Sequence, residues 1–358
     1  MRNLSALRRF AVSRSLFPRT TLTNAIEQFG FVQADPIRAP ARAQDLTLRP
    51  RVAGYRAGDL EAQYAALPIE EDFFINYGFV TKRLQALMHP RSSLSPTAAN
   101  KRAKAILEFV RARGSAHPRE VDAHFAHGRV TNYWGGTSSA TTHMLELMHY
   151  KGMLRVAGRD AGIRIYAAQQ HGDGPSGAGA RRAHLDALVD IVVSLYAPVP
   201  AASLSYIVRR LRYATPHWQA AITSALQRAK HRLAHAIVEG HTWYWPDGEA
   251  MPDRDVDGVK LLAPFDPVVW DRRRFELFWG WPYRFEAYTP APKRKHGYYA
   301  LPLLWRDRVI GWSNVAMKNG AIDAQVGYVS GRAPRDRGFR AALDDEIESM
   351  RIFLSVRS

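Results

Sequence analysis

The chain has 358 residues with 50 basic and 33 acidic side chains, a formal net charge of +17, and its 46% apolar content is enough for two or three hydrophobic cores. A charge excess of this size points to nucleic acid or an anionic surface as partner, although a basic protein can also be merely soluble. The absence of cysteine excludes disulfides, thiol catalysis and thiolate metal sites, and no apolar run is long enough to span a membrane.

The N-terminal segment is rich in arginine. Residues 1–60 contain ten arginines, no lysine and four acidic residues, a net charge of +6. Arginines among serines and threonines also occur in transit peptides. Apolar residues at the beginning of the segment instead fit a packed first helix, so a cytoplasmic protein is the simpler interpretation. These apolar residues are Leu4, Leu7, Phe10, Ala11, Leu16 and Phe17.

An amide and a carboxylate, Gln33 and Asp35, follow the apolar run 29–32 and directly precede Pro36. Because the residue before a proline is pushed out of helical geometry, Asp35 is expected on a loop. The surrounding arginines would keep Asp35 ionised and attract an anion toward it. Most isolated Asp-Pro pairs are turn caps, so the pattern alone leaves a structural and a catalytic role open.

Three predicted helices and a hairpin follow. Apolar spacing predicts helices over 101–113, from residue 117 onward, and over 137–150, and then a hairpin formed by 153–156 and 163–167. Three helices followed by a hairpin is the winged-helix arrangement, in which the third helix usually lies along the duplex.

The same order is predicted a second time, after the glycine-rich stretch 171–179, which is a flexible linker by composition. Helices are expected over 181–196, 201–211 and 218–233, with a tight hairpin formed by 234–238 and 241–245. The first 35 residues, with two short helices, could begin a third copy. Winged helices also bind proteins, and the positive charge favours DNA.

From residue 261 the apolar period changes to two. Strands are predicted over 300–305, 309–316 and 324–329, closed by a helix over 335–354. The sequence therefore predicts an α+β protein with tandem winged-helix modules. Its parts are an N-terminal helical or winged-helix-like region that contains the loop with Gln33 and Asp35 (1–95), winged helices (96–170 and 180–256), and a small C-terminal β domain, a half-barrel (257–358).

Two C-terminal blocks are specific enough to suggest a family. The segments LAPFDPVVWDR (262–272) and YTPAPKR (288–294), with Gly297-Tyr298 and LPLL (301–304), resemble the YcaQ/AlkZ family of winged-helix DNA glycosylases. The resemblance covers nearly the whole chain. Members carry a Gln-apolar-Gln or a Gln-apolar-Asp motif near the N-terminus, and Gln33-Ala34-Asp35 is similar to the second form, that of the YcaQ-like (AlkX) branch.

The resemblance implies a bacterial DNA glycosylase that is associated with the nucleoid when bound to DNA. Its expected substrates are guanines alkylated at the 7-position ring nitrogen, including interstrand crosslinks. YcaQ-like members commonly show an aromatic residue followed by Ala-His-Glu-Ala after the motif, whereas the equivalent stretch 73–80 has no His-Glu pair. If that pair positions the lesion or water, its absence would change the adduct that is handled or slow the reaction. Ala34 is smaller than the usual aliphatic residue of the motif, so the loop could be set differently.

The motif fits the chemistry of a cationic base. Alkylation already makes the guanine a good leaving group, so the enzyme must stabilise an oxocarbenium-like sugar and deliver water, a need that glycosidases meet with carboxylates. Asp35 is expected to act as electrostatic stabiliser and general base, and Gln33 to orient the water or the sugar-phosphate. No cofactor is required. Because the first 81 residues contain no lysine, a Schiff-base lyase near the motif is not expected, and a monofunctional glycosylase is predicted. A lysine that reaches the site from elsewhere in the fold is the open alternative.

Two groups of basic residues are expected to contact double-stranded DNA. Arg38, Arg42, Arg49 and Arg51 flank the motif, and Lys293, Arg294 and Lys295 form a patch beside Tyr298 and Tyr299. For the second group a solvated loop is an equally good interpretation. A monomer would suffice to surround a duplex.

Several other residues are expected to be structural. Tyr133 and Trp134 could stack on a displaced base, but core packing is the expected role. Asp266 and Asp271 are expected to hold the first turn of the β domain. The five histidines between 117 and 149 lack matched Cys or Glu partners, so no metal site is expected.

A competing hypothesis is a non-enzymatic winged-helix regulator or a lesion sensor. A sequence-specific regulator needs base-reading side chains on its recognition helix. The helix predicted over 137–150 is poor in Arg, Asn and Gln, the usual base readers, which favours the enzyme.

Overall fold

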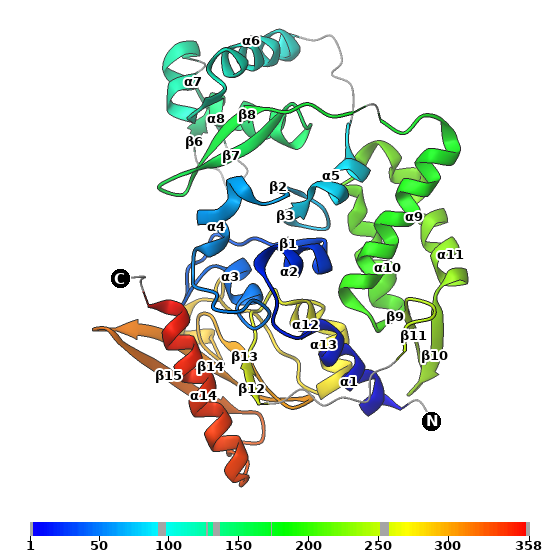
Figure 1. Cartoon of the computed structure of the whole chain (residues 1–358), viewed down its shortest axis with the longest axis vertical. Helices are drawn as coiled ribbons and strands as arrows, with labels where there is room; N and C mark the ends of the chain where they lie inside the picture. Colours follow the sequence, from blue (N-terminus) through cyan, green and yellow to red (C-terminus); the bar gives the residue numbers. More distant parts are fainter. Residues whose placement is uncertain are drawn as a thin grey trace.

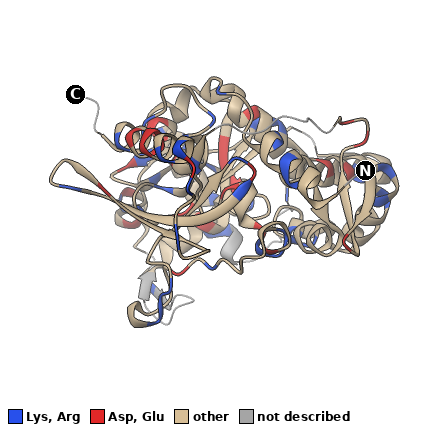
Figure 2. Cartoon of the chain, turned by 90° about the horizontal axis from the view of Figure 1, so that it is seen from below, with Lys and Arg blue, Asp and Glu red and all other residues tan. Residues whose placement is uncertain are grey.

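The computed structural model describes residues 3–91, 98–126, 128–131, 137–172, 174–250 and 258–355. In this part of the chain, helices alternate with small antiparallel sheets, giving a mixed α/β protein (Figure 1). No described helix is both long and apolar enough to cross a bilayer. Lys and Arg are distributed over helices and strands throughout the described chain (Figure 2).

The N-terminal part begins with the expected packed helix, α1 (Leu4–Ser15), which buries Leu7, Phe10 and Ala11. The side chain of Asn3 starts it by accepting a hydrogen bond from the Ala6 amide (2.9 Å). The elements that follow are α2 (Leu22–Phe29), β1 (Phe31–Gln33), α3 (Ala43–Leu48), α4 (Asp59–Gln63), the short 3-10 helix η1 (Tyr64–Ala66), β2 (Ile69–Phe73), β3 (Tyr77–Thr81) and α5 (Lys82–Met88). The three strands form an antiparallel sheet in the order β1-β3-β2.

The second part contains the first of the two expected helix-and-hairpin units. Its elements are α6 (Ala98–Arg113), β4 (Ser115–Ala116), α7 (Pro118–Phe125), α8 (Ala140–Tyr150), β7 (Leu154–Asp160) and β8 (Ile163–Ala168), and its sheet has the order β4-β8-β7. A two-stranded sheet of β5 (Arg129–Thr131) and β6 (Thr137–Ser139) lies between α7 and α8 in the sequence.

The third part repeats this order. Its elements are α9 (Gly177–Tyr196), β9 (Val199–Pro200), α10 (Ala201–Arg209), the 3-10 helices η2 (Arg210–Arg212) and η3 (Pro216–Ala221), α11 (Ile222–Arg232), β10 (Ala234–Val238) and β11 (His241–Trp245), with the sheet order β9-β11-β10. The glycine-rich segment before it has described contacts near its two ends. His171 stacks on His89 with ring centroids 4.3 Å apart, and α9 already begins at Gly177.

One topology therefore occurs three times: helix, strand, helix, helix, strand, strand, with the first strand paired to the last. The first occurrence runs from α2 to β3, well beyond the 35 residues in which its beginning was expected. In the second and third occurrences the first strand is followed almost at once by the next helix, whereas in the first occurrence residues 34–42 are inserted at this junction.

The C-terminal part contains a four-stranded antiparallel sheet in the order β12-β13-β14-β15, in which β12 and β15 are the edges. The three expected strands are present as β13 (Leu301–Trp305), β14 (Arg308–Lys318) and β15 (Ala321–Tyr328), and the closing helix as α14 (Arg337–Leu354). Sequence analysis missed β12 (Val259–Leu261), α12 (Pro267–Trp270), α13 (Arg272–Trp279) and the 3-10 helix η4 (Ala291–Lys293).

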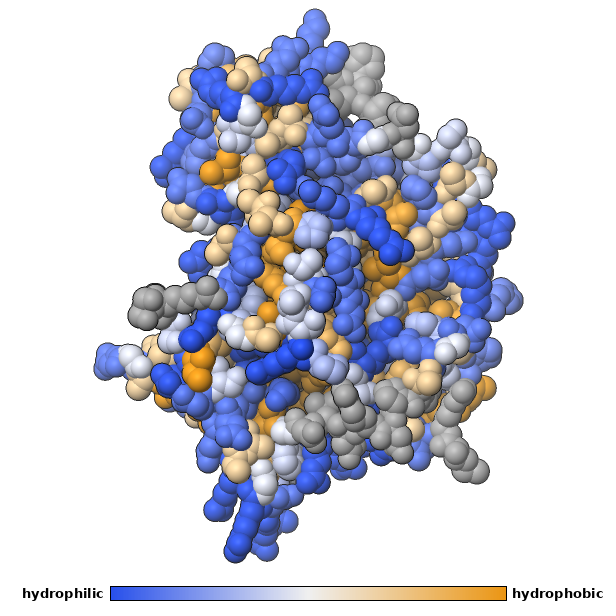
Figure 3. All heavy atoms as spheres, viewed as in Figure 1, coloured by the Kyte–Doolittle hydropathy of each residue, from blue (hydrophilic) through white to orange (hydrophobic). Residues whose placement is uncertain are grey.

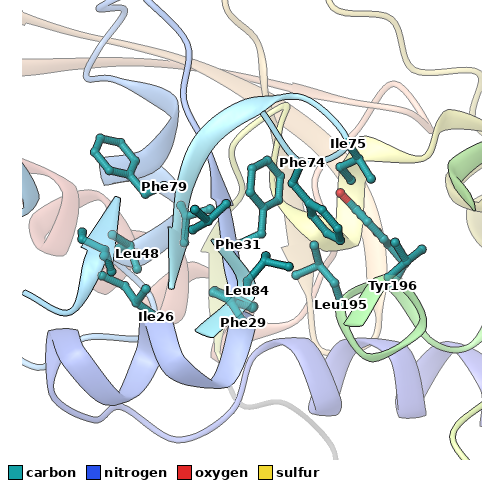
Figure 4. Close-up of a cluster of buried hydrophobic side chains, with 14 of the residues drawn as sticks. Ile26, Phe29, Phe31, Leu48, Phe74, Ile75, Phe79, Leu84, Leu195 and Tyr196 are labelled. Carbon is teal, nitrogen blue, oxygen red and sulfur yellow. The ribbon is translucent and has the colours of Figure 1, made fainter. Parts of the chain in front are cut away.

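A continuous cluster of buried side chains joins these parts. Figure 4 shows Phe29, Phe31 and Phe79, from α2, β1 and β3, in one cluster with Leu195 and Tyr196 at the end of α9. On the face shown in Figure 3, hydrophobic surface is visible mainly in depressions, and hydrophilic side chains cover most of the rest. The N-terminal region and the third part thus share a core, which fixes their relative position.

Two arginines that were expected to contact DNA are instead buried inside the protein. Both terminal nitrogens of Arg51 donate to Asp266, at 2.7 and 3.0 Å, and neither side chain is exposed. Arg49 pairs with Glu346 of α14 and also donates to the Leu261 carbonyl oxygen (3.2 Å). Because these guanidinium groups are used inside the protein, they have no surface with which to contact a phosphate.

Removing the positive charge of Arg51 should therefore destabilise the protein strongly. In an Arg51→Met variant, Asp266 keeps its charge but loses its partner, which costs about 3–5 kcal/mol for a buried pair. Urea unfolding measures this loss. Arg232→Met, which removes the cation from an exposed pair with Asp190, is the matched control and should cost less than about 1 kcal/mol. Equal losses in the two variants would contradict the structural role of Arg51.

Candidate active site

The Gln33-Ala34-Asp35 motif lies where β1 ends and the inserted loop begins. Gln33 pairs with Gly78 of β3, and the Ala34 amide donates to the Tyr77 carbonyl oxygen (3.1 Å). Gly78 allows this close approach, because a Cβ there would lie 2.3 Å from the Val32 carbonyl oxygen. The motif is therefore held by a sheet on one side and is free to form a loop on the other.

Asp35 is on a loop, as expected, and is half-buried. One carboxylate oxygen accepts a hydrogen bond from the Ile37 amide (2.9 Å), which is the turn-capping arrangement common for Asp-Pro pairs. Within the described chain no other hydrogen bond reaches this carboxylate, so its second oxygen is available to a substrate or water. A turn cap and a reactive carboxylate are compatible at this position.

Burial raises the pKa of Asp35 above its usual value of 3.8, and the Ile37 hydrogen bond offsets part of the rise. The expected field of arginines is weak here because those arginines have other partners. Arg42 pairs with Glu61, Arg49 with Glu346 and Arg51 with Asp266. Of the four flanking arginines, only Arg38 is exposed without a carboxylate partner among the described residues.

Gln33 takes part in a hydrogen-bonded chain that sequence analysis missed. The Asn76 side-chain amide donates to Oε1 of Gln33 (2.8 Å), and Arg210 donates to Oδ1 of Asn76. Asn76 lies in the turn between β2 and β3, in the stretch that lacks the His-Glu pair, and Arg210 begins η2. No sequence signal links these three residues, which are distant from one another along the chain.

Gln33 and Asn76 line a cleft of about 690 Å³. The opposite walls come from α10 and from the LAPFDPVVWDR block with the residue that follows it. Four arginines and one acidic residue give the cleft a positive charge. The arginines are Arg209, Arg210, Arg272 and Arg273, the acid is Asp271, and the aromatic lining residues are Tyr206, Phe265 and Trp270. The most specific C-terminal block and Gln33 of the N-terminal motif thus line the same cleft, whereas Asp35 is not among its lining residues.

Aromatic residues of the C-terminal part lie beside Asp35. The negative charge of Asp35 adds to the effect of burial in raising the pKa of both Tyr288 and Tyr299. Tyr299 is buried and its hydroxyl has no hydrogen-bond partner, whereas Tyr288 is 78% exposed. Phe285 contacts both rings and also Phe265 of the cleft. This aromatic cluster connects the surroundings of Asp35 to the cleft.

The basic loop 293–295 follows this aromatic cluster. The Glu286 carboxylate holds the loop by accepting hydrogen bonds from the Lys295, His296 and Gly297 amides, at 2.8–3.3 Å. Lys293 and Lys295 are exposed, while Arg294 is half-buried, donates to the Thr289 carbonyl oxygen (2.8 Å) and lies over the Tyr298 ring. Two lysines are therefore presented to solvent by a fixed backbone.

The inserted loop also contacts the second part of the chain. A Cβ on Gly162, in the turn between β7 and β8, would lie 3.4 Å from an Arg38 nitrogen and 3.5 Å from an Arg42 nitrogen. The expected DNA contacts Arg38 and Arg42 are thus beside the β7–β8 turn, and Arg42 is already paired with Glu61.

The other residues that were singled out in the sequence either have a structural role or lie outside the described residues. Asp266 and Asp271 begin α12 and α13 by accepting hydrogen bonds from the amides of Val268 (2.9 Å) and Arg274 (3.3 Å), so their expected structural role is confirmed. Asp271 also lines the cleft. Tyr133 and Trp134 lie outside the described residues. Within those residues, no group of three or more His, Asp or Glu side chains is arranged to hold a metal ion.

The chain matches the family described as AlkZ-like DNA glycosylases over residues 26–353. It therefore belongs to that family, which makes it a DNA glycosylase: a DNA-binding repair enzyme that hydrolyses N-glycosyl bonds. Its fold is similar to that of the DNA glycosylase AlkZ from Streptomyces sahachiroi, with a TM-score of 0.62 and 13% sequence identity over 99% of this chain and 97% of that chain.

The raised pKa of Asp35 predicts a pH-dependent effect on stability. Because the folded-state pKa lies above the unfolded value, ionised Asp35 destabilises the folded state once the pH rises through the folded-state pKa. An Asp35→Asn variant, which can keep the Ile37 hydrogen bond, should be more stable than the parent at pH 7.5. The difference should vanish as the pH falls toward 4.

Urea unfolding at the two pH values measures this effect. Asp344→Asn, at an exposed position on α14, is the matched control and should change stability little at either pH. A loss of stability in Asp35→Asn at pH 7.5 would show that the carboxylate is required as a structural cap.

Proposed function

We propose that this protein hydrolyses the N-glycosidic bond of guanine alkylated at the 7-position nitrogen in duplex DNA, and that interstrand crosslinks are among its substrates. Asp35 acts as electrostatic stabiliser and general base, and Gln33 orients the water. The observation that carries the proposal is the Asp35 carboxylate: it is half-buried, held through one oxygen, and two residues from Gln33, which lines a cationic cleft, in a member of a DNA glycosylase family.

The chemistry follows from the charge of the leaving group. A cationic alkylguanine leaves without protonation, so a general acid is not needed and one carboxylate is enough. As the bond breaks, positive charge develops on the sugar, and an ionised carboxylate near it lowers the barrier. A base is most effective when its pKa is close to the working pH, so the rise at Asp35 is in the useful direction. No lysine is needed, which supports a monofunctional enzyme.

The DNA contacts proposed for this site are the exposed basic groups around it. Arg38, three residues after Asp35, is exposed, as are Lys293 and Lys295 of the basic loop and Arg209 and Arg273 at the cleft. We also propose that the three repeated units are winged helices that hold the duplex across the inserted loop. The repeated order of helices and hairpin supports this interpretation, because several modules together can cradle a lesion. One chain supplies every group, so a monomer suffices.

The partly open surroundings of the motif support crosslinks as substrates. Pro36 follows Asp35 in the chain and Tyr288 lies near it, and both are exposed, so the carboxylate is not enclosed in a pocket shaped for one extruded base. A base that remains tethered to the opposite strand cannot swing fully out of the duplex, and an open site is compatible with such a substrate.

Single-turnover release of 7-methylguanine from duplex DNA tests the catalytic assignment. The parent should release the base, and Asp35→Asn should be slower by about 100-fold or more, because a positioned base and charge stabilisation contribute about 10²–10⁴-fold. DNA affinity should be unchanged. A nitrogen-mustard crosslink tested in the same way decides whether crosslinks are substrates. Binding without release of either lesion by the parent would favour a lesion sensor and overturn the proposal.

The salt dependence of binding tests the DNA contacts. A triple variant with Arg38, Lys293 and Lys295 changed to alanine should bind undamaged duplex more weakly, with a log Kd against log salt slope reduced by about three. The control changes the same charge elsewhere, at Arg335, Arg337 and Arg340 near the start of α14, which are exposed. Equal slopes for the two triple variants would show that only net charge matters, against a local DNA contact.

A further inference from the structure

We propose that Arg210 and Asn76 are positioning residues that fix the orientation of the Gln33 side-chain amide, so that Gln33 meets the substrate only as a hydrogen-bond donor. The inference rests on the proposed function and assigns roles to two residues outside the motif. Its basis is the assignment of donors and acceptors in the two hydrogen bonds that connect Arg210 to Asn76 and Asn76 to Gln33.

Arg210 fixes which group donates in each of these hydrogen bonds, because a guanidinium group has donors and no acceptor. Its Nε donates to the Ile75 carbonyl oxygen (2.8 Å), and a terminal nitrogen donates to Asn76. The guanidinium also lies 5.3 Å from the Tyr213 ring and 5.8 Å from the Trp270 ring. With backbone and rings fixing its place, Arg210 can face only an oxygen of Asn76.

The orientation of the Asn76 amide in turn fixes the orientation of the Gln33 amide. Because its oxygen faces Arg210, its NH₂ group must point the other way, where it meets the Gln33 side chain at 2.8 Å. The atom of Gln33 that it meets must then be the acceptor Oε1. The positions of oxygen and nitrogen are thus determined for both side-chain amides, Asn76 and Gln33. Both assignments depend on the guanidinium group of Arg210.

Because the Gln33 oxygen is bound to Asn76, the NH₂ group is the part of this side chain that can bind a molecule in the cleft. Among the described residues, no protein acceptor bonds to this nitrogen, and Gln33 lines the cleft. A donor at this point holds a water molecule through one of the water's lone pairs. The water can then donate a proton to Asp35 and direct its other lone pair at the sugar. A phosphate or sugar oxygen is the alternative acceptor in the same DNA substrate.

Asn76→Asp reverses this orientation with almost no change in shape. Aspartate keeps the contact with Arg210 but offers only acceptors, so Gln33 must turn its NH₂ group toward residue 76 and its oxygen toward the cleft. We expect the single-turnover rate at saturating enzyme to fall on the order of 100-fold, as for loss of one positioned donor. The apparent Kd for DNA should change by much less than the rate, and the unfolding midpoint should not fall.

A double-mutant cycle with Gln33→Ala separates this mechanism from a general effect of the new charge. If Asn76 acts through Gln33, Asn76→Asp should slow the parent but cause no further slowing in the Gln33→Ala background. Equal slowing in both backgrounds, or a parent-like rate for Asn76→Asp, would overturn the inference. The proposed function itself fails only if the folded parent releases no alkylated guanine, and this result is distinct from both outcomes of the cycle.

Discussion

The buried ion pair between Arg51 and Asp266 determines how the two halves of the site meet. Arg51 also donates to the Ser15 carbonyl oxygen (2.8 Å) and the Thr47 carbonyl oxygen (2.5 Å), so one guanidinium connects the ends of α1 and α3 to the cap of α12. Asp266 begins the helix that ends at Trp270, on the cleft wall. A buried ion pair gains little net stability over apolar packing, so the relevant property here is the single geometry that its paired hydrogen bonds allow.

The Gln33-Ala34-Asp35 motif lies at a junction where the first unit carries an insertion that the other two units lack. In the second and third units, the strand that precedes the second helix is joined to it almost directly, so this junction has no room for a loop. In the first unit residues 34–42 form a loop between β1 and α3, and the close pairing at Gly78 anchors the beginning of that loop. A rigid sheet therefore positions Gln33, while Asp35 is free of the backbone ladder. This combination of a fixed support and an accessible side chain is typical of catalytic loops.

Local patterns and the family resemblance predicted the loop, the helix-and-hairpin units and the three later strands, and they singled out the specific C-terminal block without predicting that it lies at the cleft. They did not predict which arginines are structural. Arg38 and Arg51 belong to the same basic run, but Arg51 finds a buried carboxylate 215 residues away and Arg38 finds none among the described residues. Asn76 and Arg210 were missed for the same reason, since Arg210 is 134 residues from its partner. Local periodicity and charge carry no information about such contacts.

The free-energy cost of burying the charge of Asp35 is consistent with the catalytic role proposed for it. Burial opposes its charge in the free enzyme, and a single amide hydrogen bond offsets only part of that cost. Bound DNA would remove more water and increase the cost further, unless positive charge appears nearby. Such charge is greatest when the glycosidic bond is breaking and the sugar is most cationic. In the proposed mechanism the carboxylate therefore interacts more favourably with the transition state than with the bound ground state, which is the condition for raising the rate rather than only the affinity.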